Sequence, residues 1–188
     1  MSDLFSLKGK TAIVTGGSQG IGASTALRLR KAGATVIVGD LNVREDELLA
    51  KKTDVSIEED VSALIEHAVS ATGRLDYLVN NAGIHTIYDT LEQATEADLN
   101  KCMSVNANGV MFAIKHASRV MQDGGAIVNI ASASAVLGVS GLGTYAASKS
   151  AVLALTKVAA VERAGRGTRV NSICLDPEQQ GSGHTVIE

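Results

Sequence analysis

A glycine-rich turn between two regular segments constrains the fold of this chain more than any other feature. Residues 10–15 read Lys-Thr-Ala-Ile-Val-Thr, a pattern typical of a short buried strand, and residues 21–32 carry apolar side chains at helical spacing. Between them stand Gly16, Gly20 and Gly22. Glycine permits a tight turn and a close approach of the backbone to a phosphate, which the start of a helix attracts. The turn therefore predicts a nucleotide-binding βα unit, and glycines that serve strand–helix packing alone are the alternative.

Strand-like and helix-like segments continue to alternate along the chain. The expected strands are 10–15, 35–38 (closing at Gly39-Asp40), 75–79, 126–130 and 168–173, and the expected helices are 21–32, 61–71, 96–121 and 145–163. This alternation predicts an α/β fold, a three-layer Rossmann-type doubly wound parallel sheet of about six strands. Only fourteen residues separate Asp40 from Asp54, so the third strand, 51–54, is expected to be a stub. Residues 1–174 would form one domain, and residues 175–188 a disordered or atypical tail.

The composition fits such a fold and excludes several classes of function. Hydrophobic residues make up 45% of the chain but aromatic residues only 3%, so the core must consist of Ala, Val, Ile and Leu. A net charge of −3 gives no basic surface for nucleic acid or for an anionic membrane. No apolar run approaches the roughly 18 residues of a membrane span, and no signal peptide is recognisable. We expect a cytoplasmic protein whose two cysteines are free thiols.

Tyr145 and Lys149, four residues apart in a predicted helix, form the strongest candidate for catalysis. Positions i and i+4 share one face of a helix. An ammonium group near a phenol favours the phenolate and lowers its pKa from roughly 10, which suits a general acid–base. Such a pair also arises by chance on a surface helix. Ser132, thirteen residues before the tyrosine, and the glycine turn make chance a poor explanation.

Two aspartates are candidates for contacts to the rest of a dinucleotide. Asp40 ends the second predicted strand, where a carboxylate can accept both ribose hydroxyls and would repel a 2′-phosphate. This favours NAD over NADP, and a helix cap for the following segment is the alternative. Asp54, with Val55, either contacts the adenine ring or caps the next helix through Ser56.

These motifs together resemble the short-chain dehydrogenase/reductase family. The resemblance covers about residues 5–174 and consists, in chain order, of the glycine turn 15–22, Asp54-Val55, Asn80-Asn-Ala-Gly83, Asn106 in Val-Asn-Ala-Asn-Gly, Ser132, Tyr145-x-x-x-Lys149 and Arg169-Val-Asn-Ser172. It implies an NAD-dependent oxidoreductase that interconverts a secondary alcohol and a ketone.

The resemblance also implies roles for individual residues. Tyr145 would exchange the hydroxyl proton, and Ser132 would hydrogen-bond the substrate oxygen, with Ser134 as a rival for that role. Lys149 would bind the nicotinamide ribose, and Asn106 would kink the long helix and hold a water in a proton relay. The residues expected to contact the cofactor are Gly16, Ser18, Gln19, Gly20, Ile21, Gly22, Asp40, Asp54, Val55, Asn80, Ala82, Gly83, Tyr145 and Lys149.

The remaining residues are weaker candidates for a catalytic or binding role. The four histidines, at 67, 85, 116 and 184, have no metal-binding spacing, so no metal is expected, although His85 could border a substrate pocket. The run Glu58-Glu59-Asp60 is typical of the negatively charged first turn of a helix. The loops 84–88 and 135–143 are apolar to mildly polar, which favours a small uncharged alcohol or ketone.

The sequence departs from the family pattern after the last predicted strand. Leu175-Asp176 stands where the family has Pro-Gly, and the segment that covers the substrate is expected to be missing, together with a seventh strand. A truncated, catalytically impaired NAD-binding or subunit-interaction protein is therefore an alternative function. An isomerase or dehydratase is disfavoured by the complete Ser-Tyr-Lys set. The resemblance further implies a homodimer or homotetramer formed through the helices 96–121 and 145–163.

Overall fold

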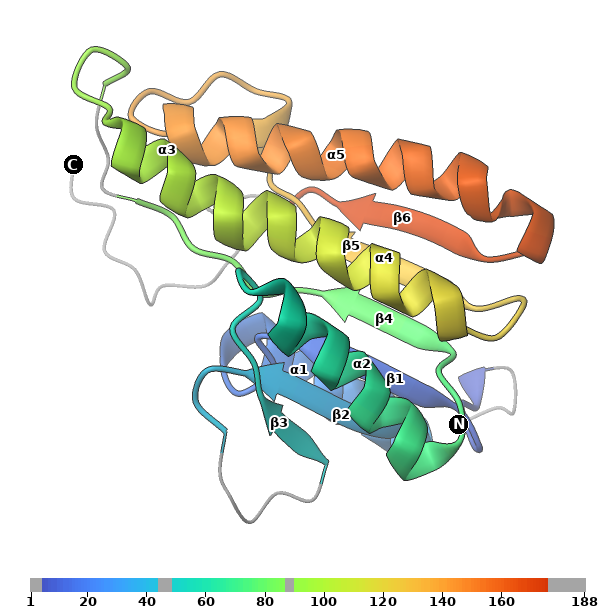
Figure 1. Ribbon diagram of the computed structural model, residues 1–188. Coiled ribbons are helices and arrows are strands. Elements are labelled where there is room, and N and C mark those ends of the chain that lie inside the picture. The colour runs from blue at the N-terminus through green and yellow to red at the C-terminus, as the bar shows by residue number, and fades with distance from the viewer. Residues whose placement is uncertain (1–4, 44–48, 87–89, 176–188) are drawn as a thin grey trace.

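Six parallel strands form the centre of the protein, in the spatial order β3-β2-β1-β4-β5-β6 (Figure 1). This computed structural model describes residues 5–43, 49–86 and 90–175. The strands are β1 (Thr11–Thr15), β2 (Thr35–Asp40), β3 (Ala50–Lys52), β4 (Tyr77–Asn80), β5 (Ala126–Ile130) and β6 (Arg169–Ile173). The helices are α1 (Gly20–Lys31), α2 (Glu58–Thr72), α3 (Glu96–Cys102), α4 (Gly109–Val120) and α5 (Gly143–Arg163).

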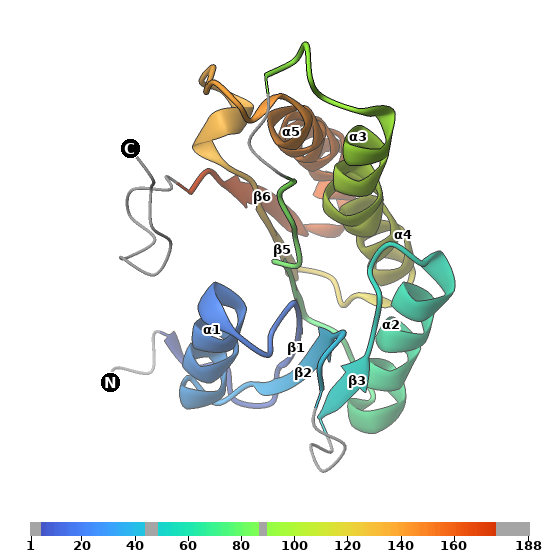
Figure 2. The same ribbon diagram turned by 90° about the vertical axis from the view of Figure 1, so that its left-hand side faces the viewer.

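The sheet is covered by helices on both faces, with α1 on one side and α2, α4 and α5 on the other (Figure 2). The alternation of side chains along each strand fills both layers. Ala12 and Val14 of β1 pack in the cluster that includes Ala26 of α1. Ile13, between them, packs in the larger cluster with Leu64 of α2. The buried strands therefore read as continuous apolar runs, as expected for a parallel sheet between two helical layers.

The chain changes direction across the sheet at β1. From β1 it passes through α1 to β2 and then β3, and it returns through α2 to β4 on the opposite side of β1. The connections that leave the carboxyl ends of β1 and β4 therefore run to opposite faces of the sheet. In doubly wound folds ligands bind at this point. Thr15 and Asn80 end the two strands and mark the place.

The structure confirms the predicted fold class and the short third strand. β3 has three residues, and six parallel strands lie in the described part of the chain. Several boundaries differ from the prediction by one to three residues. The strand expected at 75–79 is Tyr77–Asn80, and α2 begins at Glu58 because acidic side chains suit the first turn of a helix. Of the tail predicted at 175–188, all but Leu175 lies outside the described residues.

The long helix predicted at 96–121 runs over residues 96–120 and is irregular in its middle. A π-helical turn, Met103–Asn108, separates α3 from α4, and the helix ends at Val120 because Met121 has an extended backbone. Asn106, where the resemblance predicted an irregularity, lies inside this turn. Its amide side chain bonds to the backbone of Ile84 in both directions. A helical pattern of apolar residues does not reveal one extra residue in a turn.

Candidate active site

The glycine turn brings the start of α1 to the carboxyl end of β1. Gly16 and Gly20 have positive φ angles of 62° and 55°, a conformation that favours glycine. A Cβ on Gly22 would clash with the carbonyl oxygen of Gly16, so the turn and the helix can meet only through glycine. Gln19 makes no capping hydrogen bond with its side chain, and the first turn of α1 contains no acidic residue. The amides of this turn therefore suit an anion such as a pyrophosphate.

The turns after β1 and β4 are joined by hydrogen bonds that the sequence did not reveal. The side-chain amide of Asn81 donates to the carbonyl oxygens of Thr15 and Gly16, at 3.0 and 2.9 Å. In return the Thr15 hydroxyl oxygen accepts from the backbone N–H groups of Asn81 and Ala82, at 3.0 and 3.1 Å. Thr15 and Asn81 thus hold together the turns after β1 and β4, which form two walls of the crevice expected for a ligand in a doubly wound fold. The only signal for this role was the second asparagine in Asn-Asn-Ala-Gly.

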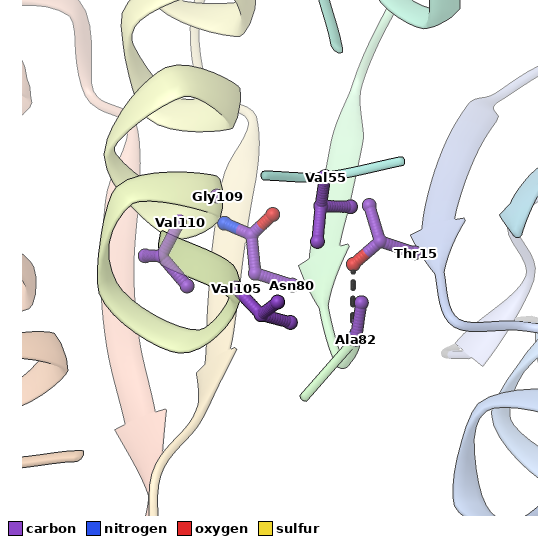
Figure 3. Close-up of a pocket in the computed structure, with 7 residues that line it drawn as sticks. All are labelled: Thr15, Val55, Asn80, Ala82, Val105, Gly109 and Val110. Atoms are coloured by element: carbon purple, nitrogen blue, oxygen red, sulfur yellow. Dashed lines mark hydrogen bonds between the residues drawn. The ribbon is translucent and has the colours of Figure 1, made fainter. Parts of the chain in front are cut away.

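Figure 3 shows the seam between these turns and the helix that crosses them. Its lining residues are Thr15, Val55, Asn80, Ala82, Val105, Gly109 and Val110. A Cβ on Gly109 would lie 2.9 Å from the carbonyl oxygen of Val55, which explains why glycine stands there. The start of α4 and the segment before α2 are therefore closely packed at this seam.

The side chains of some predicted cofactor residues already make hydrogen bonds within the protein. Asn80 is 3% exposed and donates to Oδ1 of Asn129 at 2.8 Å, so its amide lies within the sheet. The Asp54 carboxylate accepts from the backbone N–H and the hydroxyl of Ser56, at 2.9 and 2.6 Å, next to the start of α2. This is the local role that the sequence left open for it. A contact of Asp54 with adenine stays a prediction.

Asp40 lies where β2 ends, beside the glycine turn. One carboxylate oxygen accepts from the backbone N–H of Ser18 at 3.0 Å, and the other from that of Asn42 at 3.0 Å. Each carboxylate oxygen has two lone pairs, so Asp40 is held in place and keeps acceptor capacity. The negative charge stands at the mouth of the turn in which Ser18 and Gln19 are exposed.

Tyr145 and Lys149 meet on one face of α5, as predicted. The Lys149 ammonium nitrogen lies 5.7 Å from the centre of the Tyr145 ring and donates to the carbonyl oxygen of Ile130 at 2.8 Å. Lys149 is only 4% exposed. Burial lowers the pKa of Lys149 to about 8, and a weaker interaction with Cys102 acts in the opposite direction. An amine with such a pKa can exchange protons near neutral pH.

Ser132 lies between β5 and a 3-10 turn, Ala133–Ala135, that packs against α5. The Ser132 hydroxyl oxygen accepts from the hydroxyl of Ser134 at 3.0 Å and from its backbone N–H at 3.3 Å. With both donors directed at its oxygen, Ser132 keeps its own hydrogen for another acceptor. Ser134 thus supports Ser132, and the role of Ser132 in bonding the substrate oxygen stays a prediction.

Asn106 and Lys149 come together at Gly83. A Cβ on Gly83 would lie 3.2 Å from Oδ1 of Asn106 and 3.3 Å from Nζ of Lys149. The Asn106 amide donates to the carbonyl of Ile84 and to the hydroxyl of Ser148, at 2.8 and 2.9 Å, and its oxygen accepts from the N–H of Ile84. Asn106 therefore fixes the loop after β4 against α5. A water relay through it stays a prediction.

Other candidate groups lie apart from this centre. Glu58, in the acidic first turn predicted for α2, accepts from Lys115 and His116 of α4 at 2.6 and 2.9 Å, and these bonds lower its pKa. The described residues contain no group of three or more His, Cys, Asp or Glu side chains placed to hold a metal ion. Within the same residues, every helix is too short or too polar to cross a membrane.

Comparison with known proteins gives a consistent result. The sequence profile of the short chain dehydrogenase family matches residues 10–178. The chain is 40% identical over 174 residues to short-chain dehydrogenase reductase ATA1 of Arabidopsis thaliana, covering 87% of this chain and 64% of that protein. It is 38% identical to 3beta-hydroxysteroid dehydrogenase 2 of Eggerthella lenta, covering 94% and 74%. A dehydrogenase/reductase from Sinorhizobium meliloti superimposes with a TM-score of 0.85 at 38% identity, covering 93% and 74%.

Proposed function

Because the chain belongs to the short-chain dehydrogenase/reductase family, we propose that it interconverts a small uncharged secondary alcohol and its ketone with NAD(H). The chain spans 64% of the length of ATA1 and 74% of the length of the Eggerthella lenta enzyme. The observation that carries the proposal is the buried Lys149 ammonium 5.7 Å from the Tyr145 ring. This pair, with Ser132 nearby, provides one proton partner and one hydrogen-bond donor without a metal.

Each residue of the centre has a separate task in this proposal. Bound NAD(H) supplies or accepts the hydride. Ser132 donates its hydrogen to the substrate oxygen and stabilises the charge that develops there. Tyr145 gives a proton to that oxygen during reduction and takes it back during oxidation. Lys149, charged at neutral pH, favours the phenolate form of Tyr145. Asn106 holds the loop after β4, in which Gly83 lies against Lys149.

Asp40 and the glycine turn support NAD over NADP. The carboxylate lies at the end of β2 and is fixed by the N–H groups of Ser18 and Asn42. Its remaining acceptor sites suit the two hydroxyls of the adenosine ribose, and its charge would repel a 2′-phosphate. The uncapped first turn of α1, which includes Ile21, supports pyrophosphate binding beside it. Gly83 lies against Nζ of Lys149, so a nicotinamide ribose bound at the exposed Gly83 would be close to the ammonium group.

The walls beside Ser132 support an uncharged substrate. Residues 131–145 contain no Asp, Glu, Lys or Arg. Within that stretch Val136, Leu137 and Val139 are 68, 63 and 43% exposed, so the segment between Ser132 and Tyr145 presents apolar side chains. A charged substrate would lose water there without gaining an ion pair, because this segment has no charged side chain to pair with it. The other loop named by the sequence, 84–88, is described only as far as Thr86.

Exposed apolar residues on the helical face support a homo-oligomer. Met111 of α4 and Val158 and Val161 of α5 are 42, 55 and 78% exposed. Exposed apolar side chains that gather into one patch are typical of subunit interfaces, and the family resemblance places the interface on these helices. The same surface also favours the second candidate function, a subunit-interaction protein that binds NAD without turnover.

Calorimetric titration with NAD+ and NADP+, combined with an assay of NADH formation over a panel of neutral alcohols, tests the proposal. We expect NAD+ to bind more tightly than NADP+ and at least one alcohol to be oxidised. Binding of NAD+ without turnover of any alcohol would favour the interaction function. No binding of either dinucleotide would contradict both.

A further inference from the structure

The rings of His85 and Tyr145 meet edge to face. Their centroids are 6.4 Å apart and the ring planes are inclined by 85°. In this arrangement the positive edge of one ring faces the negative face of the other, which is the attractive geometry for aromatic side chains. His85 belongs to the loop that leaves the carboxyl end of β4, and Tyr145 to the first turn of α5. The contact therefore joins the two walls of the crevice at the acid–base group itself.

His85 is held in its own orientation by the loop that carries it. Its Nδ1 lies 3.1 Å from the carbonyl oxygen of Thr86. A carbonyl oxygen can only accept, so Nδ1 carries a hydrogen in this arrangement and the rotation of the ring is fixed. The hydroxyl of Thr86 in turn lies 3.0 Å from that of Thr144, the residue before Tyr145. The loop and the helix are thus tied together beside the ring contact.

The contact reaches the ring of Tyr145 from the loop after β4. The ring is half-buried, and α5 begins after Leu142 without a side-chain cap. Within α5, Lys149 lies 5.7 Å from the ring centre and donates to the carbonyl oxygen of Ile130.

We propose that His85 is a positioning residue, which holds the Tyr145 ring with its hydroxyl directed at the substrate oxygen. The role follows from the aromatic edge of His85 and not from proton exchange by its imidazole. It rests on the proposed function, in which Tyr145 is the acid–base group. Small displacements of a reacting group cost rate because they lower the fraction of productive encounters. Loss of the ring should therefore slow turnover and leave dinucleotide affinity unchanged.

Three variants separate the aromatic contact from proton chemistry. His85→Ala removes the ring, His85→Phe keeps an aromatic edge without ionisable nitrogens, and Thr90→Ala alters an exposed residue beyond the same loop as a control. We expect kcat to fall about tenfold in His85→Ala, with the NAD+ dissociation constant unchanged, and to recover in His85→Phe. Failure of His85→Phe to restore kcat would overturn the positioning role. Since His85 is exposed, none of these changes disturbs the core.

A second measurement does not depend on activity. In a protein with labelled tyrosines, the Tyr145 ring signals are identified by their loss in Tyr145→Phe. We expect these signals to shift in His85→Ala, because the ring current of His85 is lost, and to show a ring-current displacement again in His85→Phe. Unchanged Tyr145 signals in His85→Ala would overturn the inference even if the enzyme is active. If the unmodified protein oxidises no alcohol, the proposed function fails, and these spectra alone still decide whether His85 holds the ring.

Discussion

The ammonium nitrogen of Lys149 lies 5.7 Å from the centre of the Tyr145 ring and is almost completely buried. A charge placed so close to a phenol in a site of low polarity acts more strongly than it would in water. The same burial lowers the pKa of Lys149. In the proposed function the two residues work as one proton-transfer unit, and the first two predictions concern its two members.

Tyr145→Phe removes the hydroxyl and keeps the ring. We expect kcat for alcohol oxidation to fall by roughly 10²–10⁴-fold, because general acid–base catalysis contributes about that much. NAD+ affinity should change by less than about threefold, since the phenol is one of many contacts to the dinucleotide. Steady-state kinetics and calorimetry measure the two quantities. Turnover at the original rate would refute the assigned role of Tyr145.

The lowered pKa of Lys149 predicts a pH dependence of stability. The lysine pKa is about 8 in the folded protein and near its ordinary value of 10.5 in the unfolded chain. Folding therefore carries the cost of a buried charge at low pH, and stability rises as the pH passes from about 8 to 10.5. The test compares Tyr145→Phe, which keeps the lysine, with the double variant Tyr145→Phe/Lys149→Met. Between about pH 7 and pH 9.5, we expect the free energy of unfolding of the single variant to rise by about 2 kcal/mol more than that of the double variant. Urea unfolding of both variants measures this, and parallel pH profiles would contradict the burial of a titrating lysine.

Asp40→Asn keeps the size of the side chain and removes its charge. We expect NAD+ to bind about 10-fold more weakly, because hydrogen bonds from the ribose hydroxyls to a charged acceptor contribute about 1.5–3 kcal/mol. NADP+ should bind more tightly than to the unmodified protein, since the repulsion of its 2′-phosphate is gone. Titrations with both dinucleotides give the ratio directly. An unchanged ratio would show that Asp40 does not contact the ribose.

Thr15→Val tests the hydrogen bonds that join the turns after β1 and β4. The variant keeps the shape of the side chain but leaves the N–H groups of Asn81 and Ala82 without their acceptor. We expect a loss of about 2 kcal/mol in the free energy of unfolding, because unsatisfied buried donors are costly. Thr15→Ser keeps the acceptor and should lose only about 1 kcal/mol with the methyl group. If serine is as destabilising as valine, the hydroxyl does not hold the crevice.

The sequence predicted the architecture because the pattern of burial follows directly from it. The apolar run Ala12-Ile13-Val14 becomes a strand buried on both faces, and Tyr145 and Lys149 share a face because helical spacing requires it. The short interval between Asp40 and Asp54 predicted a short third strand, and β3 has three residues. These outcomes depend on periodicity and length, which a single sequence carries.

Other features depend on which side chains meet across the fold. Asn81 looked like one more residue of a motif, yet it bonds to two carbonyls of the turn after β1. Nothing in the spacing showed that Ser134 would donate to Ser132 and leave the hydrogen of Ser132 available. The edge-to-face contact of His85 with Tyr145 joins residues sixty positions apart. Such pairs become visible only when the chain is folded.

The π-helical turn Met103–Asn108 sets a limit on how this chain can change its length. Each residue of an α-helix turns the following side chains by about 100°. Deletion of one residue from the turn would restore a regular α-helix, but it would rotate the side chains after the turn relative to those before it. Cys102 before the turn and Val110 after it are both buried, in different surroundings. A deletion could keep only one of them inside the protein. We expect substitutions to be tolerated in this turn far better than loss of a single residue.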